Sequence, residues 1–76
     1  MRSAVPRGTL LDHLALAERH IAEGSVIIDK QKLLITELQR DGHDTDKSRA
    51  LLHQFEQIQE LHIADRERLI AELAKS

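Results

Sequence analysis

The segment RDGHDTD, residues 40–46, separates two long runs of regularly spaced apolar residues. Gly42 suits the left-handed backbone conformation that often follows the last turn of a helix. Asp44 or Thr45 suits the cap of the next helix, because a side-chain oxygen there accepts a hydrogen bond from an unpaired backbone N–H. A connection this short places the two flanking helices side by side and antiparallel. The sequence therefore predicts an all-α fold, an antiparallel two-helix hairpin.

The predicted hairpin fills the chain after a short tail. Thr9 is its expected first N-cap, because no apolar periodicity begins before that residue. The predicted elements are a disordered tail over residues 1–8 and a hairpin over 9–76, with a helix from about 10 to 40, a turn over 41–44 and a helix from about 45 to 74.

Apolar residues of the first predicted helix recur with a seven-residue period, as in coiled coils. One core position carries Leu14, Ile21, Ile28 and Ile35, and the other carries Leu10, Ala17, Gly24, Gln31 and Leu38. Glycine inside a helix costs about 1 kcal/mol relative to alanine, but the pattern stays in phase across Gly24, so we expect the helix to continue. The second helix has an apolar face of its own, made by Leu51, Leu52, Phe55, Ile58, Ile63, Leu69, Ile70 and Leu73.

The first helix carries more apolar surface than one partner helix covers. A third row, His13, His20, Ile27 and Leu34, runs beside its core positions, and Val26 and Leu33 lie on nearly the opposite side. Apolar residues at three heptad positions call for a third or fourth helix, and twofold dimers are the commonest oligomers. We therefore expect a homodimer that forms a four-helix bundle. Its predicted interface contains His20, Val26, Ile27, Leu33, Leu34, Phe55, His62 and Arg66.

Composition narrows the classes of function. A chain of 76 residues buries a marginal core, and it has no cysteine for a disulfide, which favours oligomerisation as support. A net charge of −2 and a single aromatic residue, Phe55, make nucleic acid an unlikely partner. No apolar run is long enough for a membrane span, so a cytoplasmic protein is expected. Nothing resembles a nucleophile elbow, a phosphate loop or a pair of buried carboxylates, so we expect neither catalysis nor a cofactor.

The tetrapeptides HIAE, residues 20–23, and HIAD, residues 62–65, repeat one pattern. A turn centred near His43 would bring both repeats into one layer, with His20 near Arg66 and His62 opposite Gly24. His62, with Gln59 and Arg66, falls near the middle of the apolar face, whereas His20 falls at the edge of its own.

Three interpretations of this layer remain open. Core polar residues can fix helix register and oligomeric state, with Glu23 and Asp65 as partners of His20 and Arg66. Alternatively, His20, Glu23, His62 and Asp65 could bind zinc or a dimetal centre, although di-iron bundles use Glu-x-x-His and this order is reversed. A core-facing histidine could also make an interface sensitive to pH. His43 and His53 are expected to be solvated, and His13 could pair with the C-terminal end near Leu73.

The segments AERHIAEG, ELQRDGHDT and LHIADRERLIAEL resemble small bacterial helical-hairpin proteins, over most of residues 17–73. The resemblance implies a hairpin and brings no activity or ligand. In architecture the chain is also similar to the small repressor of primer of plasmids, an RNA-binding hairpin that dimerises into a four-helix bundle. That similarity implies the bundle and not the RNA, because the aromatic-bearing polar face is missing.

The sequence thus predicts a non-enzymatic assembly protein that acts through homodimerisation and docking to another protein. The alternatives are a metal-binding or metal-sensing bundle and an RNA-binding bundle.

Overall fold

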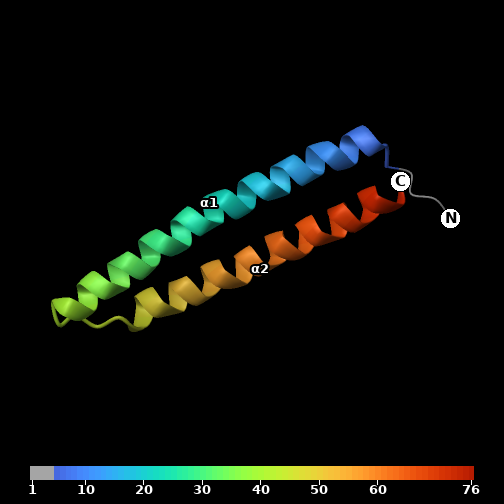
Figure 1. Cartoon of the computed structure of the whole chain (residues 1–76). Coiled ribbons are helices and arrows are strands. Elements are labelled where there is room, and N and C mark those ends of the chain that lie inside the picture. The colour runs from blue at the N-terminus through green and yellow to red at the C-terminus, as the bar shows by residue number, and fades with distance from the viewer. Residues whose placement is uncertain (1–4) are drawn as a thin grey trace.

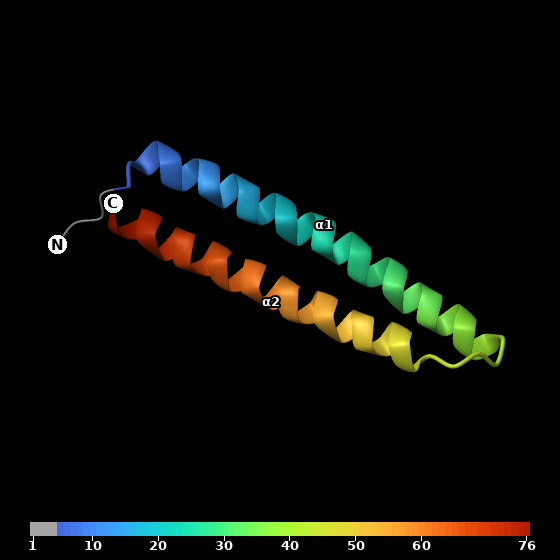
Figure 2. The ribbon, with the colours of Figure 1, turned by 180° about the vertical axis from the view of Figure 1, so that it is seen from behind.

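The chain folds into two long antiparallel helices joined by one turn, as the sequence predicts (Figure 1). The computed structural model describes residues 5–76. Helix α1 spans Arg7–Arg40 and helix α2 spans Asp46–Lys75. The hairpin is a rod with principal extents of 57 × 18 × 14 Å. Figure 2, the view from behind, shows the turn at one end of the rod, with the start of α1 and the end of α2 at the other.

Helix α1 begins three residues earlier than predicted, at Arg7 instead of Leu10. Pro6 is the N-cap residue, and its carbonyl accepts the first helical hydrogen bond from the N–H of Leu10 at 3.1 Å. Proline is tolerated at a helix start because its φ angle is already suitable and its missing N–H would be unpaired there. Of the predicted tail, residues 1–4 lie outside the described part of the chain.

The turn closes α1 with a Schellman motif. The N–H of His43 donates to the carbonyl of Leu38 at 2.8 Å, and the N–H of Gly42 donates to Gln39 at 3.1 Å. Gly42 has a φ of 78°, the left-handed conformation that was expected of it. Thr45 is the N-cap residue of α2, and Asp44 Oδ1 accepts a hydrogen bond from the N–H of Asp46 at 2.9 Å.

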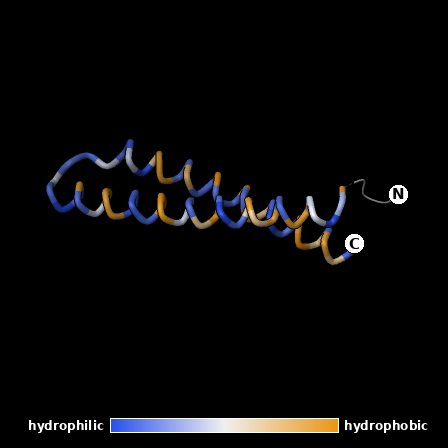
Figure 3. The backbone as a smooth tube through the Cα atoms, turned by 90° about the horizontal axis from the view of Figure 1, so that it is seen from above, coloured by the Kyte–Doolittle hydropathy of each residue, from blue (hydrophilic) through white to orange (hydrophobic). Residues whose placement is uncertain are grey.

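Every predicted heptad position of α1 is buried or half-buried against α2. The helix is continuous through Gly24, as the unbroken pattern predicts. The largest apolar cluster lies at the open end of the hairpin, where Leu10, Ala17 and Leu69 are buried and Leu14 and Leu73 pack against them. Figure 3 shows hydrophobic residues recurring along both helices between hydrophilic ones.

The seam side of α2 differs from its predicted apolar face. Two rows face α1, Leu52-Gln59-Arg66-Leu73 and Ser48-Phe55-His62-Leu69, and all of them are buried or half-buried. Leu51, Ile58, Ile63 and Ile70, which were predicted for the same face, flank the seam and are 41%, 50%, 37% and 45% exposed. The prediction was too broad because polar residues occupy the middle of the seam and apolar ones its borders.

Arg7 fastens the open end. Its Nη1 donates to the carbonyl of Leu73 at 3.1 Å and to Ser76 Oγ at 2.7 Å. The Leu73 carbonyl lies in the last turn of α2 and also accepts hydrogen bonds from the N–H and Oγ of Ser76, at 3.3 Å and 2.8 Å. Within residues 5–76, neither helix combines the length and hydrophobicity that crossing a membrane requires.

Candidate functional site

A polar layer crosses the middle of the seam, and Gln59 is its most buried member, at 8% exposure. Its Nε2 donates to the carbonyl of Ile21 at 2.8 Å and to Ser25 Oγ at 3.2 Å. Its Oε1 is buried and has no hydrogen-bond partner among residues 5–76. The layer therefore ties α2 to α1 through one amide group.

Gly24 makes room for this amide. A Cβ atom at position 24 would lie 2.1 Å from Gln59 Oε1 and 2.9 Å from Gln59 Cδ. The sequence predicted that Gly24 faces His62, which is wrong: it faces Gln59, about one helical turn away. The absence of a side chain at position 24 thus makes room for the Gln59 amide and not for the His62 imidazole.

His20 and His62 meet across the seam. Their ring centroids are 4.9 Å apart and the rings are tilted by 50°. Both side chains are half-buried. The prediction paired His20 with Arg66 because it centred the turn near His43. Figure 1 shows the connection running back beside the end of α1, and non-helical residues advance further than the 1.5 Å per residue of a helix, so α2 starts further along α1.

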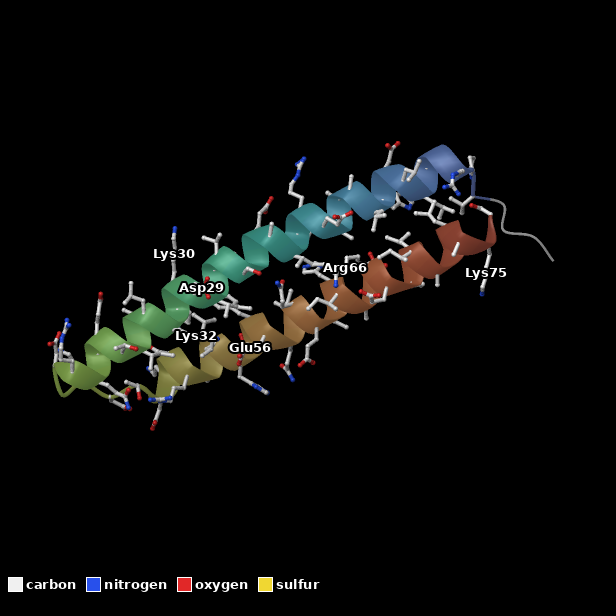
Figure 4. The ribbon with its side chains drawn as sticks, in the orientation of Figure 1. Asp29, Lys30, Lys32, Glu56, Arg66 and Lys75 are labelled. Carbon is white, nitrogen blue, oxygen red and sulfur yellow. The ribbon has the colours of Figure 1, made fainter. Side chains whose placement is uncertain are left out.

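The charged residues of the layer take partners on their own helix. Arg66 Nη2 pairs with Glu67 Oε1 at 3.0 Å, and Asp65 accepts a hydrogen bond from Arg68. The expected pairing of Asp65 with Arg66 is therefore wrong: Arg66 pairs with Glu67, and Asp65 pairs with Arg68, about one helical turn further along α2. Figure 4 shows Arg66 between the helices, whereas Lys30 and Lys75 point away from the hairpin.

Arg68 sits between two carboxylates. Besides Asp65, it donates to Glu72 Oε1 at 2.9 Å. The hydrogen bond to Asp65, with that to Glu72, raises the pKa of the exposed Arg68 guanidinium. Asp65 is consequently engaged by a cation, which opposes a role as a metal ligand.

The predicted metal ligands do not converge. The structure brings His20 and His62 together, but Asp65 is bound to Arg68. Over the described range, 5–76, no three histidine or carboxylate side chains gather closely enough to hold a metal ion. Two imidazoles alone fall short of the three or four protein ligands that zinc sites use. His13, His43 and His53 are exposed.

One side of the hairpin is hollowed by two shallow grooves, and we call it the grooved face. The first groove, about 260 Å³, has Gly24 and Gln59 at its floor and Ile27 and Ile58 among its lining. The second, about 230 Å³, is lined by His13, Ala17 and Asp65 among others, and His20 borders both. Because seven residues make nearly two helical turns, Leu34, Leu51 and Glu72 lie on the same face.

The predicted interface residues divide into three groups. His20, Phe55, His62 and Arg66 are half-buried in or beside the seam. Ile27 and Leu34 are 46% and 43% exposed and belong to the grooved face, whereas Val26 and Leu33 are 53% and 59% exposed. Val26 lies about 100° around α1 from Ile27, and Leu33 lies about 100° from Leu34. One flat partner surface therefore cannot cover both pairs.

Sequence reasoning overlooked Leu51, Ile58 and Arg7 as functional residues. Leu51 and Ile58 were assigned to the core, although their heptad positions match those of Ile27 and Leu34 across the seam. The correct register between the two helices would have placed Leu51 and Ile58 beside Ile27 and Leu34. Arg7 was assigned to the tail, and only its position just after Pro6 hints at a helix start.

No protein family, curated protein or solved structure matches this chain in the comparisons made. The function must therefore be inferred from the geometry of the hairpin.

Proposed function

We propose that this chain is a non-enzymatic assembly protein whose hairpin pairs with a second copy to form a four-helix bundle. The observation that carries the proposal is the row of large apolar side chains that one hairpin leaves in water. On the grooved face, Ile27, Leu34, Leu51 and Ile58 are each between 41% and 50% exposed.

These four side chains lie next to one another and form one apolar patch. Ile27 and Ile58 line the same groove, and Leu34 and Leu51 follow one heptad closer to the turn. Fully burying such a side chain contributes about 1.5–3 kcal/mol, so completing the burial of a half-exposed one contributes about 1 kcal/mol. A symmetric dimer doubles every contact, which makes a second copy an economical cover.

The polar layer supports a role in specificity. Gln59 bonds to Ile21 and Ser25, and only a glycine at position 24 leaves room for it. A slip of α2 by one heptad along α1 would break these bonds and bury the amide without partners. We infer that the layer fixes the register in which the grooved face is assembled.

The metal-binding alternative has less support. Its one favourable observation is the contact of His20 with His62, and the carboxylate Asp65 is bound to Arg68. The hydrogen bonds of Gln59 give the polar layer a role in fixing the helix register, and this role needs no bound ion.

The oligomeric state tests the proposal. Light scattering on a size-exclusion column should give twice the chain mass of 8.7 kDa at tens of micromolar. The thermal midpoint should rise with protein concentration, because folding and association are linked. A folded monomer whose midpoint does not change with concentration would show that two helices suffice and would refute the proposal.

A further inference from the structure

We propose that the second copy binds the grooved face with the twofold axis parallel to the helices, so that both turns lie at the same end of the bundle. This inference rests on the proposed homodimer and specifies its interface and orientation. It follows from the order of side chains along the grooved face.

The grooved face is divided into two bands along its length. The half nearer the turn is apolar, with Ile27 and Leu34 on α1 and Leu51 and Ile58 on α2. The half nearer the open end is mostly polar. It carries His13 and His20 on α1, with the half-exposed Leu16 beside them, and on α2 it carries Asp65 and Glu72, both paired with Arg68. The imidazoles of this band therefore lie on α1, and its carboxylates lie on α2.

An axis parallel to the helices superimposes like bands. Each level of one copy then meets the same level of the other, with α1 opposite α2 of the partner copy. The rows across the interface pair Ile27 with Ile58 and Leu34 with Leu51, apolar on apolar. In the other band, His20 lies level with Asp65 and His13 with Glu72, polar on polar.

An axis perpendicular to the helices does not achieve this. With full overlap, it turns one copy end over end and lays the apolar band on the carboxylates of the other. Covering ionised groups with apolar side chains costs free energy because the charges lose hydration. Sliding the copies until only the apolar bands overlap avoids the mismatch but leaves the open-end halves of both copies uncovered.

In the proposed dimer, side chains of the second copy fill the first groove. The floor of the first groove is low because Gly24 occupies a core position of α1. Ile27 and Ile58 stand at its border, half in water. In the parallel arrangement, these border side chains of each copy project into the groove of the other and fill space that α2 leaves empty.

A single spin label decides the orientation. The chain has no cysteine, so Lys75→Cys on the full chain gives one labelling site, exposed at the end of α2. With a parallel axis, the two labels in a dimer lie within about 30 Å, since packed helices are 8–10 Å apart. With a perpendicular axis, they lie near opposite ends of a rod 57 Å long or longer.

The outcomes separate this inference from the proposed dimer. A dimer with label distances above about 45 Å would keep the dimer and overturn the orientation, because helix length fixes that separation. A monomer without any label–label distance would overturn both. A dimer with the short distance supports both.

A matched pair of variants tests the face. Ile27 and Ile70 are 46% and 45% exposed and lie on opposite sides of the seam, because Ile27 borders the groove and Ile70 does not. Ile27→Asp should raise the dissociation constant by at least about 100-fold, since it buries two carboxylates per dimer. Ile70→Asp should change it less than about threefold. Dissociation caused by Ile70→Asp instead would place the interface on the other face.

Discussion

Gly24 and Gln59 form a pair whose coupling can be measured by substitution. Gly24→Ala should gain about 1 kcal/mol of helix propensity. The new methyl group would lie 2.1 Å from Gln59 Oε1, so the amide has to move. It would then lose its hydrogen bonds to Ile21 and Ser25, about 1 kcal/mol each. The net expectation is a destabilisation of about 1 kcal/mol, which lowers the thermal midpoint by about 4–8 °C in a chain of this size.

The sign should reverse when Gln59 is truncated. In the Gln59→Ala background the clash and both hydrogen bonds are already gone, so Gly24→Ala should stabilise by about 1 kcal/mol. The double-mutant cycle should therefore give a coupling energy of about 2 kcal/mol. Urea unfolding followed by circular dichroism, at one protein concentration for all four proteins, measures each free energy of unfolding. If Gly24→Ala stabilises both backgrounds equally, Gln59 does not occupy the space above Gly24 and the described seam is wrong.

Other positions give independent tests. Gly42→Ala, at a φ of 78°, should destabilise the hairpin by about 1–2 kcal/mol in the same unfolding assay, and an unchanged midpoint would contradict the left-handed turn. Asp44→Ala should cost about 1 kcal/mol by removing the acceptor of the Asp46 N–H, whereas Asp41→Ala, the control, should cost less than half as much. Calorimetric titration with zinc should show no stoichiometric micromolar binding; such binding, if lost in His62→Ala, would favour the metal-binding alternative.

The helices and the turn could be predicted because their signals are local. The heptad of α1 and the turn chemistry of Gly42 depend on neighbours in the chain, and the structure agrees with both. The start of α1 was misplaced because Pro6 ends some helices and begins others. Gln59 is buried where it was predicted, but the flanking residues of α2 were misassigned because apolar residues such as Ile58 lie at the border of the seam and not inside it.

The register across the seam was the least predictable feature. The register depends on the distance that the non-helical residues of the turn span along the hairpin axis. If α2 shifts by one helical turn relative to α1, every residue faces a different partner. That change moved His20 from Arg66 to His62 and Gly24 from His62 to Gln59. The ion pairs of Arg66 and Arg68 also depend on the choice among several carboxylates in reach, which spacing alone does not decide.

The apolar cluster at the open end joins parts of the chain that are most distant in sequence. Gln31 and Ser48, near the turn, are 17 residues apart, whereas Arg7 and Ser76 are 69 apart. Closing the short loop first costs the least chain entropy, yet the buried leucines lie beyond the polar layer. Folding outward from the turn buries Ile35 early, but the apolar cluster of Leu10, Ala17 and Leu69 forms only when the two helix ends meet, which favours one cooperative step over gradual zipping. The slowest amide hydrogen exchange is then expected around Leu14 and Leu69, so the first turns of α1 and the last turns of α2 form the most persistent part of the hairpin.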